Sequence, residues 1–239
     1  MEIQRSAERY QADHGWLKTA HSFSFADYYD PKRVQWGGLR VFNDDRIAAG
    51  EGFPTHPHRD MDIVTYVLDG KLEHKDSMGN HGVVDRYGVQ YMSAGTGVRH
   101  SEFNASKTDP LHLVQMWVLP QHTGIAPAYG QHSFSAGQLH GRWLTIASGQ
   151  AGIDAAIRLD ADATFRAAEI EPGTELHHAT APGRRAFLFV AEGSPALSAG
   201  AGAAQQLQPG DAVRIDSGEE ITLRGPAHVV LWDVDGERS

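Results

Sequence analysis

Short runs of β-branched and aromatic residues recur along the chain, and turn-forming residues separate them. The clearest run, residues 63–68, reads Ile-Val-Thr-Tyr-Val-Leu and ends at Asp69-Gly70, a dipeptide suited to a tight hairpin, before the alternating residues 71–74. Further strands are expected at 39–42, 82–84, 89–92, 111–119, 143–147, 186–190, 211–215 and 229–232. Helix signals are weak, with one local candidate at 6–12. The pattern predicts an all-β protein built as a sandwich or barrel.

The spacing of glycines indicates that the chain repeats one structural unit. Two sets of residues lie at identical offsets: Gly50, His56, His58 and Gly70, and Gly173, Ala179, Ala181 and Gly193. The unit recurs, but alanines replace its two histidines. Residues 120–149 contain proline, several glycines and no strong periodicity, which is typical of a connection. We therefore expect two domains, at 1–142 and 143–239.

Composition narrows the class of protein. With 41% hydrophobic and 21% charged residues, the chain of 239 residues resembles an ordinary globular protein. Its formal charge of −9 opposes direct binding to nucleic acid or to anionic membranes. The absence of cysteine excludes disulfides, thiolate ligands and a cysteine nucleophile. No apolar segment has the length of a signal core or a membrane span, so we expect a cytoplasmic protein.

Two short motifs carry the candidate chemistry: His56-Pro57-His58 and His100-Ser101-Glu102. Residues two apart on a strand point to the same face, so each motif presents two ligating side chains in one direction. Three imidazoles and one carboxylate suit a divalent first-row metal and leave open positions on a five- or six-coordinate ion. The pattern therefore predicts a single metal site with room for a reactant.

Both motifs, with their flanking glycines, resemble those of the cupin superfamily. Within it, the strings HPHRDMDIVTYVLDG (56–70), MSAGTGVRHSE (92–102) and HSFSFADYYDP (21–31) resemble the pirin family. This resemblance is dense in the first half and limited to a cupin-like skeleton in the second. It implies a bicupin, that is, two antiparallel β-barrel (jelly-roll) domains of which only the N-terminal one binds metal.

The resemblance also implies the ligand set and an activity. The metal ligands would be His56, His58, His100 and Glu102, and the ion iron(II), with nickel, manganese, copper, zinc and cobalt as alternatives. Asp62 stands where many cupins have a liganding glutamate, and we expect it to support the site without contacting the metal. Some pirins are quercetinases, which open the heterocycle of quercetin, a flavonol, with O2 and release CO. Glu102 would then be the catalytic proton acceptor.

Two other functions remain open on the sequence alone. Mammalian pirin resembles a non-enzymatic regulator whose metal or redox state controls binding to a protein partner, and the acidic charge is compatible with such a partner. A cupin isomerase or a purely structural bicupin is the third alternative, and the intact ligand quartet disfavours it.

Several other residues have less specific interpretations. His112 and Gln115 have opposite parity on one strand, so at most one faces the barrel interior, and both are expected to be ordinary outward polar residues. His74 and His81 are expected to face solvent. The adjacent His177 and His178 cannot share a strand face and should form no second metal site. Four aromatic residues near the N-terminus should pack in the core, between the domains, or against a planar aromatic substrate: Phe23, Phe25, Tyr28 and Tyr29.

Overall fold

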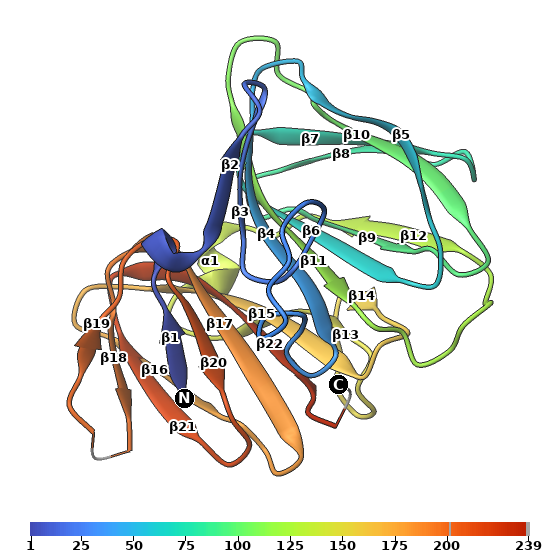
Figure 1. Ribbon diagram of the computed structural model, residues 1–239. Helices are drawn as coiled ribbons and strands as arrows, with labels where there is room; N and C mark the ends of the chain where they lie inside the picture. Colours follow the sequence, from blue (N-terminus) through green and yellow to red (C-terminus); the bar gives the residue numbers. More distant parts are fainter. Residues whose placement is uncertain (201, 238–239) are drawn as a thin grey trace.

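The computed structural model describes residues 1–200 and 202–237, and their regular secondary structure is almost entirely β-strand (Figure 1). They form four sheets, two of seven strands and two of four. In Figure 1 most of the first half of the chain, in blue to yellow-green, forms one lobe, and the second half, in yellow to red, forms an adjoining lobe that also contains the dark-blue N-terminal strand. The predicted all-β fold of two barrels is confirmed. No helix in the described part of the chain is long and apolar enough to cross a membrane.

The first half contains eleven strands, preceded by one short strand and one 3-10 turn. These are β1 (Glu2–Gln4), η1 (Ser6–Glu8), β2 (Tyr10–Asp13), β3 (Leu17–His21), β4 (Leu39–Ile47), β5 (Gly52–His58), β6 (Asp62–Asp69), β7 (Lys71–Asp76), β8 (His81–Asp85), β9 (Val89–Ser93), β10 (Val98–Asn104), β11 (Leu111–Val118) and β12 (Ala128–His132).

The second half begins with a single helical turn and continues with ten strands. These are α1 (Ala136–Leu139), β13 (Leu144–Ser148), β14 (Ile157–Arg158), β15 (Ala163–Ile170), β16 (Glu175–Ala179), β17 (Arg184–Gly193), β18 (Ala196–Ala199), β19 (Gln205–Gln206), β20 (Ala212–Ile215), β21 (Glu220–Arg224) and β22 (Ala227–Asp235). Every strand predicted from the sequence is present, several of them longer than expected.

The predicted helix at 6–12 is wrong. Only Ser6–Glu8 is helical, as a single 3-10 turn, and Tyr10–Asp13 forms β2, which pairs with β3. A helix of seven residues gains too few internal hydrogen bonds to offset its nucleation. Pairing with β3 satisfies the backbone of the same segment at the edge of a large sheet.

The two halves share the order of their inner strands. The first has the orders β12-β9-β6-β11-β4-β3-β2 and β5-β10-β7-β8, and the second has β1-β20-β17-β22-β15-β13-β14 and β16-β21-β18-β19. At one edge they differ, because β2 is antiparallel to β3 whereas β14 is parallel to β13. In the first four-stranded sheet His56 pairs with His100; in the second, exposed Ala179 pairs with Glu220, and buried His178 pairs with Ile221. The repeat expected from the glycine spacing is therefore present, and the first-motif histidines are not repeated.

The N-terminal strand β1 belongs to the sheet of the second half. It pairs with β20, with Glu2 opposite Arg214 and Gln4 opposite Ala212, and occupies the edge that β12 occupies in the first half. The domain boundary at 142/143 stays a prediction. The predicted second domain also includes residues 201 and 238–239, which lie outside the described part of the chain.

Apolar side chains gather in layers. The largest cluster lies between the two seven-stranded sheets and contains Phe42, Phe165, Phe187, Phe189 and Trp232. The second barrel encloses one continuous apolar cluster. The first barrel instead encloses two separate clusters, one around Leu72 and Leu111 and the other around Ile63 and Met92. Polar side chains occupy the space between these two clusters.

A buried ion-pair network joins the two halves near the N-terminus. The Arg9 guanidinium donates to the carbonyl oxygens of Ala20 (2.6 Å) and Gly210 (3.3 Å), and pairs with Asp44 Oδ2 at 3.3 Å. On its other side Asp44 lies 2.7 Å from His112 Nε2. Because Gly210 precedes β20 while Ala20 is in β3, one side chain connects both seven-stranded sheets.

We expect Arg9→Met to lower the free energy of unfolding by about 3 kcal/mol or more, because Asp44 loses its cationic partner and the carbonyls of Ala20 and Gly210 lose their donor. Urea unfolding followed by circular dichroism would measure the change. The matched control is Lys18→Met, whose partner Asp13 lies 3.7 Å away on the open surface. Its effect should stay within about 1 kcal/mol, and equal effects of the two substitutions would contradict a connecting role for Arg9.

Candidate metal centre

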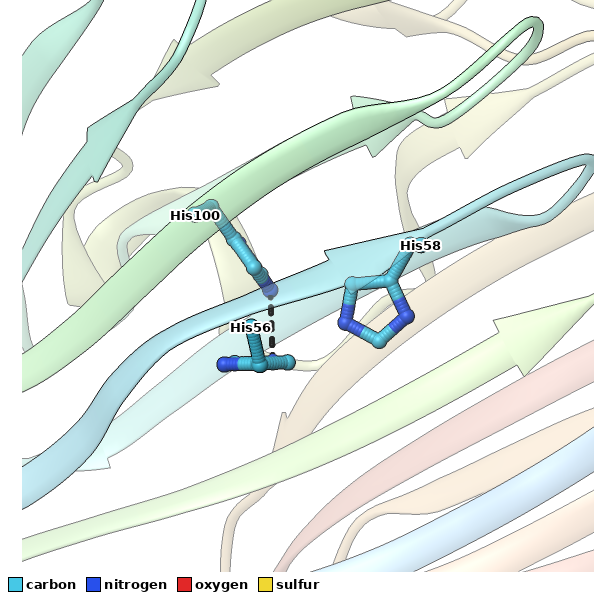
Figure 2. A group of neighbouring side chains, drawn as sticks. All are labelled: His56, His58 and His100. Carbon is cyan, nitrogen blue, oxygen red and sulfur yellow. Dashed lines mark hydrogen bonds between the residues drawn. The ribbon is translucent and has the colours of Figure 1, made fainter.

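Neighbouring strands bring three histidines together inside the first barrel. His56 and His58 lie on β5, His100 lies on β10, and the antiparallel register sets His100 opposite His56. Figure 2 shows the three rings converging between the two strands. The close approach of the strands depends on Gly52, since a Cβ atom there would lie 2.2 Å from the carbonyl oxygen of Glu102. A ligating nitrogen of each ring lies within 4.8 Å of the other two.

Hydrogen bonding prepares His56 to act as a ligand. Its Nδ1 lies 2.8 Å from the carbonyl oxygen of Pro54, so Nδ1 carries the proton and Nε2 presents its lone pair. That Nε2 lies 3.0 Å from Nε2 of His100. Two nitrogens bound about 2.1 Å from one ion at a right angle would be about 3 Å apart. The spacing of the donor atoms therefore fits a shared divalent metal.

The electrostatic environment keeps two of these rings neutral near pH 7. Burial, followed by the neighbouring imidazoles, lowers the pKa of His58 to about 4 and that of His100 to about 3. A metal ligand must present a free lone pair, which a protonated imidazole lacks. Both rings are therefore in the ligating form across the neutral range.

The carboxylate of Glu102 is held beside the histidines by three donors. Gln115 Nε2 donates to Oε2 at 2.7 Å, while Gln90 Nε2 and the Thr65 hydroxyl donate to Oε1. Oε2 lies 3.9 Å from His100 Nε2. Because the whole group is buried, the three donors replace the water that the carboxylate loses.

These donors belong to a line of side chains that crosses the inner face of the seven-stranded sheet. Cross-strand neighbours on five strands form what we call the polar row: His21, Asn43, Gln115, Thr65 and Gln90. The polar row occupies the level that separates the two apolar clusters of the first barrel. It therefore sets the depth at which Glu102 is held.

A cavity of about 440 Å³ opens beside the histidines and Glu102. Aromatic side chains form much of its wall, with His58 packed edge-on against Trp117 at a ring distance of 4.9 Å and Phe25 against the same indole at 5.3 Å. The size and apolar lining are those of a small-molecule site. A reactant in this cavity would therefore lie next to the coordination positions that the protein ligands leave open on such an ion.

His74 is the clearest correction to the sequence interpretation. It was expected to face solvent, yet its side chain is fully buried, bonded to Asp76 (3.2 Å) and stacked on Tyr129. It pairs with Glu102 across β7 and β10, and forms a second ligand-like group with His100 and Glu102. The alternation Leu72-Glu73-His74 placed it on the inner face, a signal available in the sequence. His81, which was also expected to face solvent, is exposed.

Gln115 is the second correction. It lines the cavity and donates to Glu102, whereas His112, of opposite parity, faces the junction between the halves and pairs with Asp44. The expectation that at most one of them faces inward is confirmed; the expectation that both are outward polar residues is wrong for Gln115. His177 and His178 lie on opposite faces of β16, and no metal-like group of described residues includes them.

Asp62 contacts the second half of the chain and none of the candidate ligands. Its Oδ2 accepts from the backbone nitrogen of Asp160 at 2.9 Å, and its Oδ1 accepts from the Tyr91 hydroxyl at 3.3 Å.

Two of the upstream aromatic residues occupy environments that the sequence predicted: Phe23 packs on Phe187 between the halves, and Phe25 lines the cavity. Tyr29, in contrast, is 75% exposed.

Two barrels that share the order of their inner strands, with a histidine cluster in the first, define a bicupin with one candidate metal centre. Family profiles agree with this class. The pirin profile matches residues 3–118, and the profile of the quercetinase C-terminal cupin domain matches residues 145–234. The chain belongs to the pirin family.

Individual relatives cover nearly the whole chain. The quercetin 2,3-dioxygenase of Escherichia coli K12 is 41% identical over 97% of both chains. The pirin-like protein of Caulobacter vibrioides is 40% identical over 93% of this chain and 94% of its own. Among solved structures, the bacterial pirin YhhW of Escherichia coli in complex with nickel(II) has a TM-score of 0.88 and 37% identity, and the match covers 98% of each chain.

Substitution can decide which of the two overlapping groups binds a metal. We expect His56→Ala to lower the affinity for Ni(II) by about 100-fold or more, and His74→Ala to lower it by about tenfold or less, because the Nε2 of His74 already pairs with Asp76. Calorimetric titration with Ni(II) would measure both. Greater loss in His74→Ala would assign the ion to the group of His74, His100 and Glu102.

The metal-free protein should lose stability as pH falls from about 6.5 toward 4. The unfolded histidines take up protons near 6.5, whereas folded His58 does so near pKa 4 and His100 near pKa 3. The unfolded state therefore binds more protons in this window, and the free energy of unfolding decreases as the pH falls. Urea unfolding in EDTA at several pH values would show the slope. His100→Gln should flatten it, and an unchanged slope in that variant would contradict the assignment.

Proposed function

We propose that this protein is a metal-dependent dioxygenase of the quercetinase type, which opens the heterocycle of a flavonol with O2 and releases CO. The observation that supports it most is the junction of three ligand-ready histidines with a cavity walled by aromatic side chains. Relatives named quercetin 2,3-dioxygenase at about 40% identity, and a related pirin that binds nickel(II), support the same activity.

In this proposal His56, His58, His100 and Glu102 hold the ion, with iron(II) as our first choice and nickel, manganese, copper, zinc and cobalt as alternatives. When bound, the ion supplies Lewis acidity to the 3-hydroxyl and ketone region of the flavonol and a place to activate O2. The neutral imidazoles of His58 and His100 provide lone pairs without first losing a proton. Phe25 and Trp117 hold the planar ring system against one wall of the cavity.

Glu102 serves as the proton acceptor for the 3-hydroxyl. Its Oε2 lies on the side of the histidines and of the cavity, and there it accepts only from Gln115 among the described residues. Its Oε1 is held by Thr65 and Gln90. With one oxygen fixed by two donors, the carboxylate can change its coordination at the other oxygen and take the proton there while the side chain stays in place.

Anaerobic loading with Fe(II), Ni(II), Mn(II) or Cu(II), followed by quercetin and O2, tests this function. We expect O2 consumption and CO release from the loaded protein, measured with an oxygen electrode and by gas chromatography. Glu102→Ala should lower kcat by about 100-fold or more. Asp62→Asn should lower it less, because Asp62 contacts Asp160 and Tyr91 and not the candidate ligands.

Measuring the metal content of the wild-type protein and of both variants distinguishes the possible results. A loaded protein that leaves quercetin intact contradicts the proposed activity and favours the alternative of a metal-dependent, protein-binding regulator. Equal loss of metal in Glu102→Ala and Asp62→Asn contradicts the ligand assignment, whichever ion is used.

A further inference from the structure

The cavity has one polar corner that the candidate metal centre does not use. Asn43 and Asp45 on β4 and His21 on β3 line it, and these side chains are only 3%, 3% and 5% exposed. Asn43 Oδ1, Asp45 Oδ1 and His21 Nδ1 are buried and have no hydrogen-bond partner among the described residues, and the same holds for the hydroxyl of Thr19, which stands opposite Asp45 across β3 and β4. Four orphaned polar atoms in one corner are unusual, because buried polar groups in folded proteins are nearly always paired.

The position of these residues explains why they lack partners. Asn43 and His21 are one end of the polar row, and Gln115 is the neighbour of Asn43 across the sheet. From Gln115 onward the row donates to Glu102, which gives each of those side chains an acceptor, although Gln90 Oε1 has no partner among the described residues. At the other end no carboxylate of a described residue is hydrogen-bonded to Asn43 Oδ1 or His21 Nδ1, and the row faces the cavity instead. Asp45 stands two residues along β4 on the same inner face.

The rest of the cavity wall defines what could satisfy this corner. Leu17, Phe25, Phe53 and Trp117 offer no charged group, so the body of a ligand must be apolar and preferably planar. Two of the four orphaned atoms are carboxyl or amide oxygens, which accept hydrogen bonds from hydroxyl groups. Burial raises the pKa of Asp45 to about 7; the neighbouring Thr19 hydroxyl opposes this rise, and the negative charges of Asp44 and Glu102 add to it. A neutral hydroxyl suits such a group better than a cation or an anion does.

We propose that His21, Asn43 and Asp45 form a hydroxyl-binding subsite, which selects polyhydroxylated planar aromatic substrates over their unsubstituted counterparts. The inference rests on the proposed function, because it takes the same cavity as the substrate site. The metal side of the cavity holds the reacting enol, and the subsite binds hydroxyl groups carried elsewhere on the ring system. These three are positioning residues, which act on affinity and orientation.

Two probes that differ only in their additional hydroxyl groups test the subsite: quercetin and 3-hydroxyflavone, which keeps the reacting 3-hydroxyl and ketone. Binding to the Ni(II)-loaded protein without O2 can be followed by quenching of tryptophan fluorescence. We expect the wild-type protein to bind quercetin about tenfold or more tightly than 3-hydroxyflavone. In Asn43→Leu and Asp45→Leu the ratio should fall to about two or less, with the affinity for 3-hydroxyflavone little changed.

A matched control and a stability measurement exclude a merely structural effect. Arg46 is the next residue of β4 and is exposed, so Arg46→Leu should keep the wild-type ratio. The ligand-free leucine variants should keep or raise the wild-type Tm, since each replaces an unpartnered buried acceptor with a side chain of similar volume. A fall of more than about 4 °C in both would show that these groups support the fold and would overturn the subsite.

The results distinguish this inference from the function on which it rests. An unchanged affinity ratio in both leucine variants overturns the subsite alone. Failure of the loaded wild-type protein to bind either flavonol overturns the proposed function and the subsite together. A reduced ratio with retained Tm and retained Ni(II) affinity supports the subsite.

Discussion

The burial of one carboxylate inside a β-barrel is the constraint on which the rest of this structure depends. An ionised side chain removed from water is strongly unfavourable unless donors replace the lost hydration. Here Thr65, Gln90 and Gln115 supply those donors, and each comes from a different strand of the seven-stranded sheet. Their common level across the sheet divides the apolar interior in two. The first barrel therefore has two separate apolar clusters, because the side chains that hold Glu102 beside three histidines lie between them.

The second barrel shows what the same scaffold does without that constraint. Its inner strands have the same order, and it encloses one continuous apolar cluster. The inner face of β16 carries one buried histidine, His178, which belongs to no ligand-like group of described residues. The large aromatic layer between the seven-stranded sheets then makes the second barrel a rigid support for the first. The inner face of the first barrel is thereby free to carry polar groups.

Local sequence patterns were sufficient for the strands, the repeat and the meeting of the histidines. Residues 63–68 and 89–92 are apolar enough to be recognised as buried strands, and His56, His58 and His100 carry a spacing with a direct geometric meaning. The roles of Thr65, Gln90 and Gln115 could not be read in the same way. Each has apolar neighbours on both sides in its strand, and only the cross-strand register shows that they lie side by side.

Other misses have a similar origin in long-range pairing. The segment at 6–12 resembles a weak helix in isolation, and its strand conformation depends on β3. His74 resembles a surface residue after a turn until β10 is placed beside it. Asn43 and Asp45 resemble surface acids and amides in the sequence Asn-Asp-Asp, although the structure buries both beside the candidate metal centre. Charged and polar residues that look like surface residues in the sequence are therefore buried where distant strands enclose them.

The place of β1 has a consequence for how the chain is made. Residues 2–4 are synthesised long before their partner strand, residues 212–215. During elongation β1 therefore has no partner until most strands of the second half have also been made. Closure of this sheet edge couples segments from the two halves of the chain, so that a chain that terminates before β20 retains an unpaired β1.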